Sequence, residues 1–170
     1  LHKQTAHQID LLNDWLKKLT ATDDPKEKRE LLRRIVVVGA YLKRRNNLIL
    51  VNEQDGIIKE EELNLSIQEM MKNLQLAGIH CAGTVEFDID LPTDVAMKLF
   101  DFYEYVVENA FDGLDSLLAR FFYRDNSFYA CIDAVCSLDL TKLQNEQIFV
   151  SVSDKNCYTL SLKIEGGDGR

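Results

Sequence analysis

Two stretches at the start of the chain repeat apolar residues at alternating steps of three and four. One covers residues 1 to about 20 and the other runs from Pro25 to about Val51. The apolar positions are Ile9, Leu12, Leu16 and Leu19, preceded by Thr5, and then Leu31, Ile35, Val38, Leu42 and Ile49. This spacing predicts two amphipathic helices. Asp24 as N-cap, Pro25 as first helical residue and Glu27 as capping-box partner predict a short connection and an antiparallel hairpin.

The pattern after residue 56 changes between helical and strand-like periods. A helix is predicted from Lys59 to Ala77 with Gly78 as its stop, and another opens at Leu91-Pro92-Thr93 with Thr93 as its cap and runs to Leu114. The predicted strands are Ile79–Ile89, Phe128–Val135, Ile148–Ser153 and Tyr158–Ile164. Two helices on one face of a mixed sheet give a two-layer α/β sandwich, so the predicted fold class is α+β.

Charge divides the chain near Asp55-Gly56. Residues 1–56 carry 11 Lys and Arg against 8 Asp and Glu, whereas residues 57–170 carry 9 against 20. We therefore expect two domains, 1–56 and 57–170. The acidic balance of the second disfavours nucleic acid as a partner. Because one hairpin cannot bury both of its apolar stripes, a four-helix bundle of two hairpins is expected, which predicts a homodimer through residues 1–56.

The chain contains no apolar run long enough to span a membrane, so direct membrane insertion is not expected. Its four cysteines form no CxxC pair and have no histidine at metal-ligand spacing, which favours free thiols and a reducing cytoplasm. Leu1 is not methionine. The expectation is the cytoplasmic part of a larger parent with a sensor or membrane region upstream.

Glu108 and Asn109 lie side by side in a helix whose other positions are largely apolar. Burying these groups costs free energy unless they are paired or bind something. A carboxylate and an amide oxygen together suit a divalent cation or a held water. The alternative is that both are half-exposed residues with solvent partners.

Three motifs in order resemble the cytoplasmic core of a sensor histidine kinase. His2-Lys3-Gln4-Thr5-Ala6-His7 matches the opening of the dimerisation helix in the subgroup with His-Asp-x-x-Gly-His or Gln. Glu108-Asn109-Ala110 matches the asparagine box of the Bergerat-type ATP-binding fold. Glu165-Gly166-Gly167-Asp168-Gly169 stands where that fold has an Asp-x-Gly-x-Gly box. The resemblance implies a phosphoacceptor hairpin followed by a Bergerat-type sandwich.

The resemblance also implies roles for single residues. His2 matches the phosphoacceptor that attacks the γ-phosphoryl of ATP. Asn109 matches the Mg²⁺ ligand, with Glu108 beside it. Glu165 matches the carboxylate that holds the adenine amino group, and Gly167 and Gly169 match the glycines that let the backbone approach the nucleotide. The implied cofactors are ATP and Mg²⁺, and the implied partner is a response regulator.

The sequence also departs from the family pattern. Lys3 stands where an acid is usual, Asp112 and Gly113 stand where a basic residue and a histidine are usual, and Glu165 replaces aspartate. The chain reaches Arg170 directly after the glycine motif, so a C-terminally truncated sandwich without the ATP lid is expected. Three hypotheses remain open: an ATP-dependent histidine kinase, a degenerate pseudokinase that acts as a dimeric signalling or partner-binding scaffold, and a kinase of which this is a fragment.

Overall fold

The computed structural model describes the backbone of residues 2–52 and 56–167 and the side chains of residues 5–50 and 56–167. Its first part is the predicted hairpin, formed by α1 (His2–Ala21) and α2 (Pro25–Asn52). The Asp24 side chain caps α2, because its Oδ1 accepts a hydrogen bond from the Lys26 amide at 3.0 Å. Glu27 does not complete the capping box: its carboxylate accepts the Thr22 hydroxyl, and the Asp24 amide donates to that hydroxyl oxygen.

The two later helices also lie close to their predicted bounds, as α3 (Glu60–Leu76) and α4 (Thr93–Ala110). Gly78 adopts a φ of 86°, the left-handed conformation that ends a helix at glycine, so its predicted role is confirmed. Thr93 was the wrong choice of cap for α4, since Pro92 holds the cap position and no side chain caps that end. The helix also ends at Ala110, four residues before the predicted Leu114.

Five strands form one sheet in the order β2-β4-β5-β7-β6, with β2 and β4 parallel and the other neighbours antiparallel. Their bounds are β2 (His80–Glu86), β4 (Leu114–Arg124), β5 (Ser127–Cys136), β6 (Ile148–Asp154) and β7 (Cys157–Glu165). The sequence interpretation missed β4, although this strand lies inside the sheet between β2 and β5. Its apolar residues point to both faces, with Phe121 buried and Leu118 exposed, so the two-residue period is weak.

A second, two-stranded ribbon was also missed. It consists of β1 (Ile57–Ile58) and β3 (Leu91–Pro92), which pair antiparallel. Ile58 and Leu91 are fully buried in it. Through this pairing, the residues that follow the hairpin lie beside the residues that precede α4.

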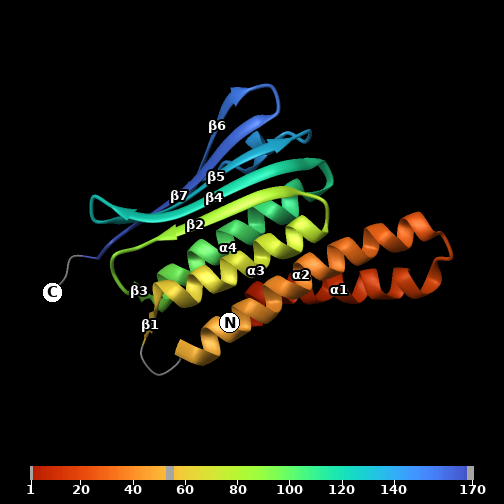
Figure 1. The fold of residues 1–170 in the computed structure, drawn as a ribbon, viewed down its shortest axis with the longest axis horizontal. Helices are drawn as coiled ribbons and strands as arrows, with labels where there is room; N and C mark the ends of the chain where they lie inside the picture. The colour runs from red at the N-terminus through yellow and green to blue at the C-terminus, as the bar shows by residue number, and fades with distance from the viewer. Residues whose placement is uncertain (1, 53–55, 168–170) are drawn as a thin grey trace.

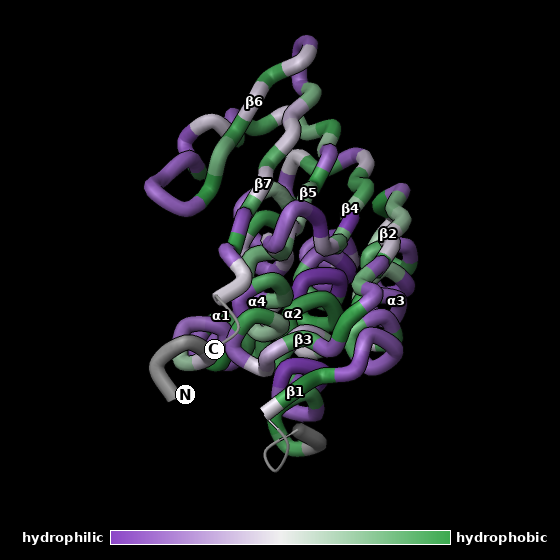
Figure 2. The backbone as a smooth tube through the Cα atoms, turned by 90° about the vertical axis from the view of Figure 1, so that its left-hand side faces the viewer, coloured by the Kyte–Doolittle hydropathy of each residue, from purple (hydrophilic) through white to green (hydrophobic). Residues whose placement is uncertain are grey.

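The molecule is layered, with the sheet on one side of α3 and α4 and the hairpin on the other (Figure 1). The view turned by 90° shows the five-stranded sheet above the helices, with the ribbon of β1 and β3 at the lower end (Figure 2). Helices α3 and α4 cover one face of the sheet, as predicted, through Leu63, Ile67, Leu99 and Tyr103, all fully buried. Hairpin side chains such as Tyr41 join the same buried cluster. The hairpin is therefore packed against the sandwich along α2.

Candidate functional site

The hairpin and α4 meet along a line of acidic residues, Asp101, Glu104 and Glu108, spaced by three and four positions on one face of the helix. Each carboxylate has a different environment. Asp101 accepts two hydrogen bonds from the Arg45 guanidinium, at 2.8 and 3.0 Å, and one from the Tyr41 hydroxyl at 2.8 Å. Burial and the Asp101 carboxylate raise the pKa of Tyr41, so its hydroxyl stays a donor.

Glu108 binds the first helix of the hairpin. Its Oε1 lies 2.7 Å from Nε2 of His7, and its Oε2 accepts a hydrogen bond from the Gln8 amide at 3.1 Å. The Glu108 side chain is 19% exposed, whereas that of His7 is 64% exposed. The carboxylate is thus held and largely covered, while most of the imidazole faces solvent. This pairing joins residues 101 positions apart and could not be inferred from local spacing.

Asn109 does not point its amide group at a partner outside its own helix. Its Nδ2 donates to the carbonyl of Tyr105 at 2.8 Å, one turn earlier in α4. Among the residues whose side chains are described, no group of three or more His, Cys, Asp or Glu is placed to hold a metal ion. The Mg²⁺ role that the resemblance implies for Asn109 therefore stays a prediction without a cluster of further ligands around it.

Glu165 and Gly167 lie at the other end of the sheet. Glu165 pairs with Ser127 at the start of β5, and the Gly166 amide donates to the Asn126 carbonyl at 2.8 Å in the β4–β5 turn. At the opposite end of β5, the Cys136 thiol contacts the carbonyl of Ala110, next to Asn109. Ten strand residues separate these ends, a span of about 30 Å. The roles that the resemblance implies for Asn109 and Glu165 require both residues to hold one nucleotide, and this expectation of a shared cleft is wrong for the residues that the structure describes.

Two further predicted site residues cannot be placed. His2 lies in α1, but its side chain is outside the described part of the structure, and Gly169 is outside it altogether. Both keep the roles that the resemblance implies as predictions only.

The segment that does lie beside the end of α4 is the β5–β6 connection. The Ser137 amide donates to the Gly113 carbonyl at 2.9 Å, and a methyl group on Gly113 would stand 2.5 Å from the Ser137 hydroxyl oxygen. Asp139 caps the short helix Leu140–Leu143 through the Thr141 amide, and its hydrogen bonds with Thr141 lower its pKa. The β5–β6 connection, residues 137–147, contains no glycine motif, so no signal in the sequence indicated that this loop lies beside α4.

Glu104 is the unusual residue of the acidic face. It is 1% exposed, and neither of its carboxyl oxygens has a hydrogen-bond partner among the described residues. Burial, followed by the charges of Glu108 and Asp101, raises its pKa well above the ordinary value. It belongs to the face of α4 that packs against the hairpin, beside a cavity of about 430 Å³ that His7, Tyr41 and Tyr105 also line.

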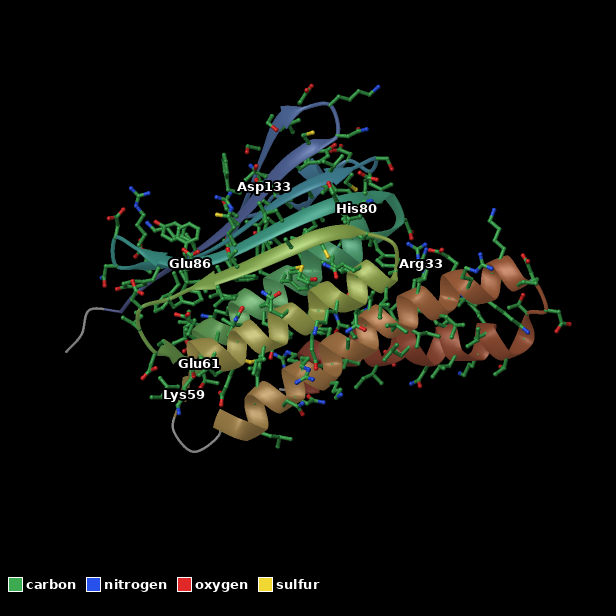
Figure 3. The ribbon with its side chains drawn as sticks, in the orientation of Figure 1. Arg33, Lys59, Glu61, His80, Glu86 and Asp133 are labelled. Carbon is green, nitrogen blue, oxygen red and sulfur yellow. The ribbon has the colours of Figure 1, made fainter. Side chains whose placement is uncertain are left out.

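The hairpin is fastened to the sandwich at several other points. Arg33 of α2 donates to the carbonyl of Ala77 at the end of α3 at 2.6 Å, and Figure 3 shows its side chain between the two layers. Arg34 pairs with Asp112, and Arg44 pairs with Glu69.

Every helix in the described ranges is too short or too polar to cross a membrane.

No protein-family model matches the sequence. A comparison with curated proteins gave no match either. Among solved structures, a bacterial phosphotransferase is similar, with a TM-score of 0.50 and 13% identity over 95% of this chain and 92% of that one. The histidine kinase AdeS of Acinetobacter baumannii gives a TM-score of 0.47 and 10% identity over 99% of both chains. The blue-light activated histidine kinase EL346 of Erythrobacter litoralis gives 0.48 and 11% identity over 96% of this chain and 62% of that one.

The match with the phosphotransferase covers almost the whole of both proteins, so hairpin and sandwich together form a shared fold. The fold expected from the resemblance to histidine kinases, a helical hairpin followed by a two-layer α/β sandwich, is the fold that the structure has. At 13% identity the likeness concerns the fold and leaves the chemistry to the residues of this chain.

Proposed function

We propose that the protein acts in two-component signal transduction as a histidine kinase-like phosphotransfer protein. Its hairpin receives a phosphoryl group on histidine and passes it to the aspartate of a response regulator. The observation that supports this best is the exposed His7 imidazole on α1, held by the buried end of Glu108 at 2.7 Å. The fold shared with a phosphotransferase supports it as well.

The His7–Glu108 pair suits a nucleophilic imidazole. When the Glu108 carboxylate accepts a hydrogen bond from the Nε2–H of His7, the other ring nitrogen, Nδ1, keeps its lone pair and can attack phosphorus. The carboxylate also stabilises the positive charge that the ring acquires during transfer. Because the side chain is 64% exposed, a receiver domain can approach it. His2, the acceptor implied by the resemblance, lies five positions earlier in the sequence and is the alternative acceptor.

ATP and Mg²⁺ are not needed in this proposal. Glu108 is bound to His7 and Gln8, the Asn109 amide is bound within α4, and Glu165 is at the far end of the sheet. A nucleotide could contact Glu108, Asn109 and Glu165 together only if these residues changed their present positions and hydrogen bonds. We therefore expect the phosphoryl group to come from a phosphorylated receiver rather than from ATP.

The test uses phosphoramidate, a small donor that phosphorylates histidine, and intact-protein mass spectrometry. Wild-type protein should gain one acid-labile phosphoryl group, His7→Gln should not, and His80→Gln should label normally, because His80 lies on the edge strand β2 away from the hairpin (Figure 3). Loss of label in His2→Gln instead would move the acceptor to His2. Labelling by Mg²⁺-ATP alone would refute the nucleotide-independent form, and labelling of neither histidine would refute the proposal.

A second candidate function is a dimeric scaffold without phosphoryl chemistry, favoured by apolar residues left exposed on the hairpin. Ile9 and Leu16 of α1 are each 47% exposed, and Leu32 and Val36 of α2 are 48% and 42% exposed. These side chains suit burial in a four-helix bundle with a second hairpin. The predicted seam residue Val38 is instead 4% exposed and packs within its own chain.

For the dimer, Leu32→Asp is expected to give monomers that keep their helical circular dichroism, because a carboxylate cannot be buried in a bundle seam. Val38→Asp is expected to unfold the chain instead, at a cost of several kcal/mol. Sedimentation velocity distinguishes the two outcomes. A wild-type protein that sediments as a monomer at high concentration would contradict the bundle.

A further inference from the structure

Two consecutive residues of α1 bind the Glu108 carboxylate, one at each oxygen. Oε1 lies 2.7 Å from Nε2 of His7, and Oε2 accepts a hydrogen bond from the Gln8 amide nitrogen at 3.1 Å. Successive helix residues point about 100° apart, so they do not face each other but can flank a third group. Because both oxygens have a partner, the plane of the carboxylate is fixed relative to the imidazole.

Gln8 is the residue that prevents this carboxylate from turning. Among the side chains that the structure describes, it is the one hydrogen-bond partner of Glu108 besides His7. A glutamate side chain has considerable rotamer freedom. A carboxylate bound at one oxygen only would therefore rotate, and its orientation toward Nε2 of the imidazole would be lost for part of the time.

Gln8 holds Glu108 without cancelling its charge. No Lys or Arg side chain that the structure describes forms an ion pair with this carboxylate. A cation in the place of Gln8 would offset the negative charge and weaken its stabilisation of the positive ring that forms during phosphoryl transfer. A neutral amide supplies the hydrogen bond and leaves the charge directed at His7.

Stability alone does not explain the place of Gln8. Its Oε1 is buried and has no hydrogen-bond partner among the described residues. The amide cannot turn over to satisfy this atom, because the Glu108 carboxylate accepts hydrogen bonds and needs the nitrogen end of the amide. A buried acceptor without a partner costs free energy, so this arrangement is more consistent with a role in the site than with a contribution to folding.

From these observations we infer that Gln8 is a positioning residue for phosphoryl transfer to His7. It fixes the Glu108 carboxylate in front of Nε2, which keeps the ring proton on Nε2 and leaves the lone pair of Nδ1 free to attack phosphorus. This role rests on the proposed function, because it belongs to the same reaction. It adds a residue that the resemblance to histidine kinases did not single out.

The first measurement is the labelling rate with phosphoramidate, in which the Nδ1–P bond forms as the P–N bond of the donor breaks and ammonia leaves. Gln8→Leu removes the amide and keeps similar bulk, and it should label about tenfold more slowly than wild type without loss of thermal stability. The matched control is Asn13→Leu, at an exposed position of the same helix, which should label at the wild-type rate.

A double variant separates positioning from any other role. Because Gln8 acts through Glu108, Gln8→Leu combined with Glu108→Ala should label as slowly as Glu108→Ala alone. A further loss in the double variant, equal rates for Gln8→Leu and wild type, or an unfolded Gln8→Leu would each overturn the inference while wild-type labelling keeps the proposed function. Absence of label on wild type would overturn both.

The second measurement needs no phosphoryl donor and no activity. Nitrogen-15 resonances of the neutral His7 ring report which ring nitrogen carries the proton. In wild type the fraction with the proton on Nε2 should exceed that of a free histidine, and in Gln8→Leu it should fall to the free value. A wild-type fraction equal to that of free histidine would contradict the positioning role, whatever the variants do.

Discussion

Replacing Asp101 by alanine is expected to lower the free energy of unfolding by about 3 kcal/mol. The Asp101 carboxylate accepts two hydrogen bonds from Arg45, whose side chain is only 4% exposed, and one from the Tyr41 hydroxyl. Its removal leaves the buried Arg45 guanidinium without this counter-charge and the hydroxyl of the buried Tyr41 without its acceptor. Urea denaturation followed by circular dichroism measures the change.

The matched control for this prediction is Asp112→Ala. Asp112 also pairs with an arginine of α2, Arg34, but its side chain is 56% exposed. Exposed ion pairs contribute little, so the expected loss is below about 1 kcal/mol. If both variants lose the same stability, burial is not what makes the Asp101 pair important, and the packing of the hairpin on α4 described above is wrong.

Glu104→Gln is expected to stabilise the protein at neutral pH and to flatten the pH dependence of its stability. The pKa of Glu104 is raised in the folded protein, chiefly by burial and then by Glu108 and Asp101. Below pH 4.5, its ordinary pKa, both states hold the proton and the residue has no pH effect. Above that pH the unfolded chain releases the proton and the folded chain keeps it, so stability is lost as pH rises, by at most about 1.4 kcal/mol per pH unit.

Thermal unfolding of wild type and Glu104→Gln from pH 4 upward checks this sign. The two curves should meet near the ordinary pKa of 4.5 and separate at higher pH, with the variant more stable. Glu61→Gln, at an exposed position, should follow the wild type throughout. A Glu104→Gln variant that is less stable than wild type at neutral pH would mean that the Glu104 carboxylate is ionised and held by a partner.

Local sequence patterns were enough to predict the helices. The three-and-four steps of the hairpin, Asp24 before Pro25, and Gly78 after α3 each record a constraint on a few neighbouring residues, and all three were predicted correctly. The prediction of β4 failed because its local pattern is weak. Leu118 and Phe122 are apolar residues on the outer face of the strand, so the alternation of apolar and polar residues that marks a half-buried strand is incomplete.

Local patterns were not enough to predict the candidate site. The sequence pointed to Glu108 and Asn109 as polar residues in an apolar helix, and the resemblance to histidine kinases grouped them with Glu165 as nucleotide-binding residues. The missed strand reverses the chain once more, and this reversal moves Glu165 to the opposite end of the sheet. Whether two motifs lie at the same end of a sheet depends on the number of strands between them in the sequence. One missed strand is therefore enough to place two motifs together when they lie at opposite ends.

The sequence by itself determined the amphipathic hairpin, the two helices of the sandwich and its α+β class, because each follows from the periodicity of neighbouring side chains. Only the tertiary structure decided that His7 meets Glu108, that Asp101 meets Arg45, and that Glu104 is buried without a partner. These are contacts between distant segments. Whether a carboxylate on α4 is solvated, paired or left alone depends on which face of the hairpin packs against it.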